Sequence, residues 1–359
     1  MKKILNIVGA RPQFIKAFIT MKSLNHIKSS KNILLHTGQH FDYSMSKIFF
    51  KELNFQNLLI KINLNEKNDR LIRLAEIIAK LTKKIKKINP DLIIIYGDTD
   101  TTLAASIVAR RLQIKLMHIE AGLRSSVLEM PEEQNRYISD YLSDYLIAPT
   151  KNALKNLNYL KQKKIFNCGD VMFDSILFYK KLVNKEYTNN FLKKYKLQKN
   201  YIFFSIHRDS NSNFKKIKKY LYQISKFKNL FFWPIHPKIQ KIISLNKLKI
   251  PKNLIYCSPI SYMNTIAAIK SSDFVITDSG GVQKESYFLS KKVFVLRNET
   301  EWEELISLNC LKLIGNNLEI INKSKKFLYS KIKKSNYFGS GNSTKKISLL
   351  VKKILISKI

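Results

Sequence analysis

The stretch ILNIVGARPQFIK, residues 4–16, decides the fold class of this chain. Its apolar run Ile4–Val8 is typical of a buried strand, Gly9 permits a tight turn, and Pro12 suits the first turn of a helix. A strand followed at once by a helix is the first half of a βαβ unit. We therefore expect a parallel sheet that includes residues 4–8.

Beyond this stretch, short apolar runs alternate with longer amphipathic segments, which predicts an α/β protein. A chain of 359 residues is long enough for two domains, which we place at 1–170 and 171–359 with a hinge near 170–176. The stretch Ser343–Ile356 has helical apolar spacing and could lean back on either domain. The other expected strands are Ile33–His36, Leu92–Tyr96, Leu116–Ile119, Tyr145–Ala148, Tyr201–Ser205, Leu230–Trp233, Leu254–Tyr256, Phe274–Thr277 and Val293–Leu296.

The formal net charge of +38, taken alone, favours a nucleic acid or an anionic membrane as partner. The excess is +13 in residues 1–170 and +25 in residues 171–359, and lysine supplies 55 of the 64 basic residues. The excess is not concentrated in a single basic arm. We therefore interpret it as lysine spread over a surface that tolerates it, and we expect neither nucleic-acid binding nor membrane insertion. A basic nucleic-acid-binding protein is the alternative from another class.

Cysteine usage and the N-terminal residues indicate the compartment. Cys168, Cys257 and Cys310 are widely spaced, which argues against both a disulfide framework and a zinc site. The apolar run Ile4–Val8 is too short for a signal peptide or a membrane span. We expect a cytoplasmic protein.

Ligands of open α/β sheets bind beyond the carboxyl ends of the strands, so the residues that follow each expected strand are the candidate site. Asp98 and Glu120 follow two strands of the first half, and Glu132 lies at a helix start soon afterwards. Clustered carboxylates push one another's pKa values apart, so that one site can hold a proton acceptor and a donor. For Glu132, a favourable interaction with the helix dipole is the structural alternative.

Three other loops suggest contacts to an anionic ligand. The helix start after Gly9 offers N–H groups to an anion, with Arg11 and Lys16 close by, although it is neither a P-loop nor a dinucleotide fingerprint. His207 and His236 follow two strands of the second half, where a structural role is the alternative. A later strand leads into Ser279, Gly280 and Gly281, which can present N–H groups and a hydroxyl to a diphosphate, and into Glu285, which can take two ribose hydroxyls.

Eight motifs of the chain belong together, and they extend nearly from end to end. They are GARPQFIK (9–16), TGQHFD (37–42), YGDTDTTLA (96–104), HIEAGLRS (118–125), MPEEQNR (130–136), IHR (206–208), TDSGGVQKE (277–285) and LRNETEW (296–302). In these motifs and their order, the sequence resembles the non-hydrolysing bacterial UDP-N-acetylglucosamine 2-epimerases. The resemblance implies a GT-B fold, in which two Rossmann-like domains with parallel sheets face a central cleft. It also implies a UDP-sugar substrate, a homodimer, and neither a nicotinamide nor a required metal.

The same resemblance implies a chemistry in which UDP is eliminated as the C2 proton leaves, and then adds back with the proton on the other face. It assigns the C2 proton to the three carboxylates, without dividing the roles among them, and an acid/base role near the leaving diphosphate to His207. The remaining implied contacts are Arg11, Lys16 and Arg136 to the phosphates and the intermediate, His236, Ser279, Gly280 and Gly281 to UDP, and Glu285 to the ribose.

Departures from the family pattern bear on the substrate. Gln13 and Lys284 stand where many UDP-N-acetylglucosamine epimerases have Glu. With MPEEQNR, IHRDSN and TEW, they look more like the branch that acts on UDP-2,3-diacetamido-2,3-dideoxyglucuronic acid. Both substrates stay open, as does a regulatory second UDP-sugar site at Gln39 and His40. A GT-B glycosyltransferase or a hydrolysing epimerase would share the fold, but HIEAGLRS and PEE disfavour the transferase.

Overall fold

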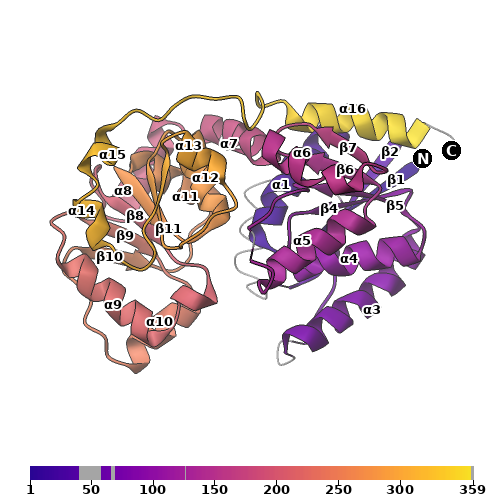
Figure 1. Cartoon of the computed structure of the whole chain (residues 1–359). Coiled ribbons are helices and arrows are strands. Elements are labelled where there is room, and N and C mark those ends of the chain that lie inside the picture. The colour runs from indigo at the N-terminus through magenta and orange to yellow at the C-terminus, as the bar shows by residue number, and fades with distance from the viewer. Residues whose placement is uncertain (40–57, 66–68, 126, 357–359) are drawn as a thin grey trace. The chain divides into compact units, whose positions relative to one another are not determined.

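The computed structural model describes the chain except for residues 40–57, 66–68, 126 and 357–359 (Figure 1). His40, named above for a second UDP-sugar site, lies outside the described residues. The described chain divides into two compact units, Met1–Ser175 with Asn336–Ile359 and Ile176–Ser335. The division falls inside helix α7 (Val171–Leu182), within the expected hinge region 170–176, and helix α16 (Ser343–Ile356) belongs to the first unit.

Each unit contains a parallel sheet, which confirms the predicted α/β class. The first sheet has the order β3 (Leu58–Lys61), β2 (Ser30–His36), β1 (Lys2–Val8), β4 (Leu92–Tyr96), β5 (Lys115–Ile119), β6 (Tyr145–Ala148) and β7 (Lys164–Asn167). The second has the order β10 (Leu254–Cys257), β9 (Phe231–Pro234), β8 (Ile202–Ser205), β11 (Phe274–Thr277), β12 (Val293–Val295) and β13 (Leu311–Leu313).

Helices connect the strands in each unit (Figure 1). In the first unit they are α1 (Arg11–Leu24), α3 (Arg70–Ile88), α4 (Asp100–Arg111), α5 (Pro131–Leu142) and α6 (Lys151–Asn156). In the second they are α8 (Lys185–Lys194), α9 (Phe214–Ser225), α10 (Pro237–Leu245), α11 (Tyr262–Ser271), α12 (Gly280–Phe288), α13 (Glu303–Ser307), α14 (Glu319–Asn322) and α15 (Lys325–Tyr329). Among the described residues, none of the helices combines the length and apolar content that a membrane crossing needs.

The strand order reverses at one place in each sheet. β1 pairs with both β2 and β4, so the first reversal lies between β1 and β4. β8 pairs with both β9 and β11, so the second lies between β8 and β11. Loops diverge at such points and leave a crevice at the carboxyl ends of the strands, which is where ligands of open α/β sheets bind. The predicted motifs after residues 8, 96, 205 and 277 all begin there.

Three strands, β3, β7 and β13, were not predicted from the sequence. All three form an edge of their sheet among the described strands. An edge strand is covered on fewer sides, so it needs less apolar sequence than a central one. β7 shows this, because each of its four residues is partly or fully exposed. Central strands β4, β6 and β11 have the predicted bounds.

The stretch in which the chain leaves the first unit and the stretch in which it returns pack closely together. Gly169 and Gly339 both have positive φ, at 90° and 85°. A Cβ at Gly169 would lie 3.0 Å from the carbonyl oxygen of Phe338, so a side chain there would displace backbone. Beside this contact, Asp174 of α7 accepts hydrogen bonds from the amides of Ser343 (3.1 Å) and Thr344 (2.8 Å). Asp174 therefore caps the start of α16, which packs along α1 (α16 is yellow in Figure 1).

Asp174→Ala should lower the free energy of unfolding of the first unit by about 2 kcal/mol, because buried N–H groups of α16 lose their acceptor. Urea denaturation measures this, and amide hydrogen exchange in residues 343–356 should accelerate. Glu186→Ala removes an exposed first-turn acid from α8 and is the control. Equal effects in the two variants would contradict the capping role.

Candidate active site

Gln13 joins the first turn of α1 to the end of β4. Its side-chain oxygen accepts hydrogen bonds from the amides of Gly9 (2.7 Å) and Ala10 (3.1 Å), and its Nε2 donates to the carbonyl of Tyr96 (2.5 Å) and the hydroxyl of Thr102 (2.9 Å). The side chain is buried. Gln13 therefore holds two strand ends together. Its buried side chain offers no surface to a substrate.

The start of α1 offers fewer N–H groups to an anion than predicted. The amides of Gly9 and Ala10 are bonded to Gln13, Pro12 has no N–H, and the amide of Gln13 donates to the carbonyl of Ala10 (2.9 Å). Arg11, which begins the helix, is half-buried. The positive charge expected in this loop is present, whereas the row of free amides is not.

Asp98 follows β4 and is paired with Arg136 of α5. The Nε and Nη2 atoms of Arg136 lie 3.0 and 2.5 Å from one oxygen of Asp98. Its Nη1 donates to Glu133 (2.6 Å), which is fully buried and also accepts from the amide of Ser125. Glu133 therefore fixes the guanidinium from behind, and the side chain of Asp98 stays 30% exposed.

Glu120 follows β5 and is paired with Lys16 of α1, with both side chains less than a tenth exposed. Glu120 has a φ of 74°, and its amide donates to the carbonyl of Ile147 (3.1 Å). Gly97 lies beside this pair, because a Cβ there would be 3.4 Å from Glu120 Oε2. The ends of β4 and β5 and the first turns of α1 thus meet at one place.

Glu132 lies in the first turn of α5, and its carboxylate is 3.8 Å from Arg70 Nη2. The same guanidinium makes two hydrogen bonds to Asp100, at 2.9 and 2.8 Å. Asn135 donates to Asp100 as well (3.1 Å). Sequence reasoning did not find Arg70, since nothing in its polar surroundings signals a partner thirty residues away.

The structure brings the three predicted carboxylates to the carboxyl edge of one sheet, and each contacts a different cation. The sequence argument relied on carboxylates that act on one another, whereas here cations are interleaved among them. A carboxylate held this way can accept a proton, and the cations beside it can stabilise developing negative charge. The pairs are Asp98 with Arg136, Glu120 with Lys16, and Glu132 with Arg70.

In the second unit, Asp278 fixes the loop that carries His207. Its carboxylate accepts from the amides of His207 (2.8 Å) and Arg208 (3.1 Å) and from the side chain of Asn211 (3.0 Å). Asp278 is fully buried, and His207 is exposed. The residue follows β11, so it joins the two strands at which the order reverses. Sequence reasoning quoted Asp278 within its motif without assigning it this function.

Ser279 caps α12, and its hydroxyl accepts from the amide of Val282 (3.5 Å). A Cβ at Gly281 would meet only the Ser279 hydroxyl, at 3.8 Å, so the surface there is open. A Cβ at Gly280 would collide with the carboxylate of Glu301, which packs against this turn. Glu285 is buried further along the helix. The turn is therefore open to a ligand on the Gly281 side.

His236 and Lys284 complete the set of predicted residues in this unit. His236 is exposed at the start of α10, and its Nδ1 accepts from the amide of Lys238 (3.2 Å). Lys284 is buried, with its ammonium 3.9 Å from the centroid of the Trp302 ring. Lys284 and the Trp of the TEW motif, which both pointed to the substrate in the sequence, thus form one cation–π contact inside the protein.

Other chemistries find little support in the described residues. Burial raises the pKa of the Cys168 and Cys257 thiols to about 11 and that of Cys310 to about 12, so none is a reactive thiolate at neutral pH. No group of three or more metal-ligating side chains forms within the described ranges.

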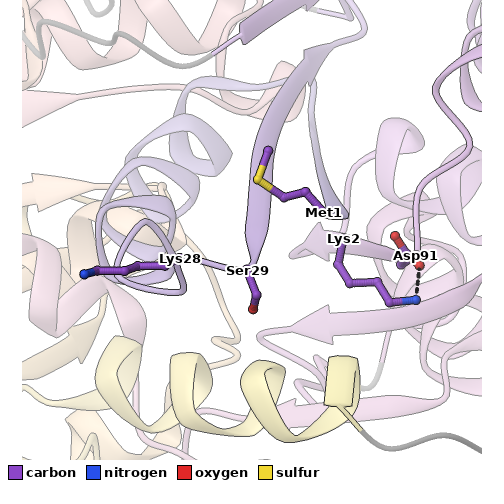
Figure 2. A pocket seen from close by; sticks show the side chains of 5 residues that line it. All are labelled: Met1, Lys2, Lys28, Ser29 and Asp91. Atoms are coloured by element: carbon purple, nitrogen blue, oxygen red, sulfur yellow. Dashed lines mark hydrogen bonds and ion pairs between the residues drawn. The ribbon is translucent and has the colours of Figure 1, made fainter.

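A hollow of about 560 Å³ lies at the amino end of β1, away from the strand ends described above. Its lining includes Lys2 and Asp91, which Figure 2 shows bonded to each other (2.8 Å), and Lys28, which is directed away from them. Burial raises the pKa of Asp91, but hydrogen bonds from Lys2 and the Lys3 amide bring it below its ordinary value. Ligands of open sheets bind at the opposite edge, so this hollow is not the candidate site.

Comparison with known proteins identifies the family. The sequence profile of the UDP-N-acetylglucosamine 2-epimerases matches residues 22–352. A UDP-N-acetylglucosamine 2-epimerase homolog of Methanococcus maripaludis is 37% identical over 96% of this chain and 98% of its own length. The UDP-2,3-diacetamido-2,3-dideoxy-D-glucuronate 2-epimerase of Pseudomonas aeruginosa is 33% identical over 98% of this chain and all of its own.

Solved structures agree with this result. The Methanocaldococcus jannaschii UDP-GlcNAc 2-epimerase, crystallised with UDP-GlcNAc and UDP, is 31% identical and matches with a TM-score of 0.90 over 98% of this chain and 99% of its own. The fold is therefore of the GT-B type, with two Rossmann-like units, as predicted. Because the profile and these relatives span nearly the whole chain, the protein belongs to the UDP-N-acetylglucosamine 2-epimerase family, whose members are nucleotide-sugar epimerases.

Proposed function

We propose that this protein is a non-hydrolysing UDP-N-acetylglucosamine 2-epimerase that interconverts UDP-GlcNAc and UDP-ManNAc for bacterial surface polysaccharide synthesis. The observation that carries the proposal is the set of three carboxylates at one sheet edge, each beside a cation. A glycosyltransferase of the same fold has no use for three such groups. An enzyme that removes and returns a proton at a carbon does.

In the proposed reaction, a carboxylate of the set Asp98, Glu120 and Glu132 takes the C2 proton. The electron pair of the C–H bond forms the C1=C2 double bond as the C1–O bond breaks, and UDP leaves with the electrons of that bond. UDP then attacks C1 again, and a proton is delivered to the other face of C2. Cationic groups favour such steps because they stabilise charge that develops in the transition state.

The remaining residues receive the supporting roles. Arg11, Lys16 and Arg136 stabilise the phosphates and the intermediate, and His207 acts as acid/base near the leaving diphosphate. The open turn at Gly281 supports a UDP site in the second unit. That site comprises His236, Ser279, Gly280, Gly281 and Glu285.

A second substrate, UDP-2,3-diacetamido-2,3-dideoxyglucuronic acid, is supported by the full-length similarity to the Pseudomonas aeruginosa enzyme. The same carboxylates would act on the same carbon, because this sugar differs from UDP-GlcNAc at C3 and C6. The side chains of Gln13 and Lys284, which pointed to this second substrate in the sequence, are both buried. Their contacts are with protein groups and do not decide between the two sugars.

Incubation in heavy water with either UDP-sugar should give a mixture of epimers that carry deuterium at C2 and keep UDP. Only a C2 proton that leaves and returns can exchange with solvent. Proton NMR measures epimer ratio, deuterium content and intact UDP-sugar together. Exchange with one donor alone identifies that donor as the substrate. Free sugar plus UDP indicates the hydrolysing reaction. A folded, UDP-bound protein that exchanges neither donor contradicts the epimerase proposal.

Asp98→Asn, Glu120→Gln and Glu132→Gln should each lower turnover by roughly a hundredfold or more, since each removes a proton acceptor or its charge. Wild-type rates in two of the three carboxylate variants would refute the assignment of the set.

Ser279→Ala and Glu285→Ala should instead weaken UDP binding, measured by calorimetry. Unchanged UDP affinity in both of these variants would refute the UDP site.

We also propose a cytoplasmic homodimer. Exposed apolar side chains on two helices of the first unit support an interface, because monomers rarely expose such groups together. Light scattering should give twice the 41.9 kDa of the chain, and Tyr141→Glu should lower this mass while Tyr329→Glu, in the second unit, should not. A monomeric mass for the unaltered protein would contradict the proposal. The exposed residues are Leu71, Ile72, Tyr137, Ile138 and Tyr141.

A further inference from the structure

His118 and Asp140 form a buried pair beneath the ends of β4 and β5. His118 Nδ1 lies 2.8 Å from Asp140 Oδ1, and both side chains are completely buried. The other ring nitrogen, Nε2, lies 2.7 Å from the carbonyl oxygen of Gly97. Neither residue has a part in the proposed reaction.

The partners define the hydrogen bonds of the pair. A carbonyl oxygen only accepts, so His118 Nε2 donates to Gly97. Asp140 Oδ2 accepts from the amide of Gly122 (3.1 Å) and lies 2.8 Å from Arg124 Nη2. One ring and one carboxylate therefore link the carbonyl of Gly97 to the amide of Gly122.

The backbone groups held by this pair belong to two turns. Gly97 has a φ of 64°, which glycine adopts readily, and its carbonyl belongs to the peptide bond that leads into Asp98. Gly122 has a φ of 81°, and Glu120, two residues earlier, has a φ of 74°. For a residue with a side chain, such as Glu120, this left-handed backbone persists only when its surroundings enforce it. One ring and one carboxylate thus fix both turns, and each turn carries one of the carboxylates assigned above.

We propose that His118 and Asp140 are positioning residues that set the placement of Asp98 relative to Glu120. The inference rests on the proposed function and deepens it. Buried polar groups are costly to desolvate, and apolar residues of similar size would pack the same space without that cost. Here the pair provides directional hydrogen bonds to the two turns, which apolar side chains cannot provide.

The test uses variants that keep one donor at a time. In His118→Gln the side-chain amide can replace Nε2 and reach the Gly97 carbonyl, whereas in His118→Asn it can replace only Nδ1. Asp140→Asn removes the charge at constant size. We expect kcat for C2 exchange to fall on the order of 100-fold in His118→Asn and Asp140→Asn and less in His118→Gln, because a small misplacement of reacting groups costs about this much.

The affinity for UDP, measured by calorimetry, should stay unchanged in all three folded variants. The proposed UDP site lies in the other unit, and the variants keep the proposed phosphate contacts Arg11, Lys16 and Arg136. His26→Gln, at an exposed histidine of the first unit, is the control and should behave like the unaltered protein. An equal loss of turnover and UDP affinity, a wild-type kcat in folded variants, or better activity in His118→Asn than in His118→Gln would each overturn the proposal.

If the unaltered protein exchanges no C2 proton, the proposed function fails. If it does exchange and the variants behave like the control, the positioning role alone fails.

Discussion

At each point where the strand order reverses, one buried polar side chain links the ends of two diverging strands. Gln13 bonds to backbone groups after β1 and at the end of β4, and Asp278, which follows β11, bonds to backbone amides after β8. Where two strands diverge at a reversal, backbone groups at their ends lose the hydrogen-bond partners of a neighbouring strand. Buried backbone groups then need another hydrogen-bond partner. The candidate site residues project from loops whose course these two side chains fix.

The distribution of charge follows from the same requirement. The chain has 26 acidic residues against 64 basic ones, yet several of its acids are buried where they hold backbone or cations. Glu133 holds Arg136, Asp174 holds the start of α16, and Asp278 holds the His207 loop. A large basic excess is therefore compatible with an enzyme, because the acids that the fold and the site need are in place beneath a lysine-rich surface.

Sequence patterns predicted the central strands well, because strands covered on both faces are written as continuous apolar runs. The bounds of β4 and β11 were correct, and edge strands such as β7 were missed for lack of that signal. The predicted strand ends also placed Asp98 and Glu120 just after two neighbouring strands, and the structure has them after β4 and β5. The partners in those loops, such as Arg70 for Asp100, could not be predicted, since they pair side chains distant in sequence. Likewise the spacing in 343–356 indicates a buried face without indicating what covers it.

The return of α16 to α1 reverses the order in which the two units can be completed during synthesis. Residues 176–335 form a continuous unit, so every part of it has been made before the ribosome reaches α16. Folding of the first unit can be completed only after its last residues have been made. Until then, the α1 surface that packs against α16, whose buried residues include Ile347 and Val351, stays uncovered. Domains usually mature in the order in which they are translated. In this chain the part that is made first is the last to close.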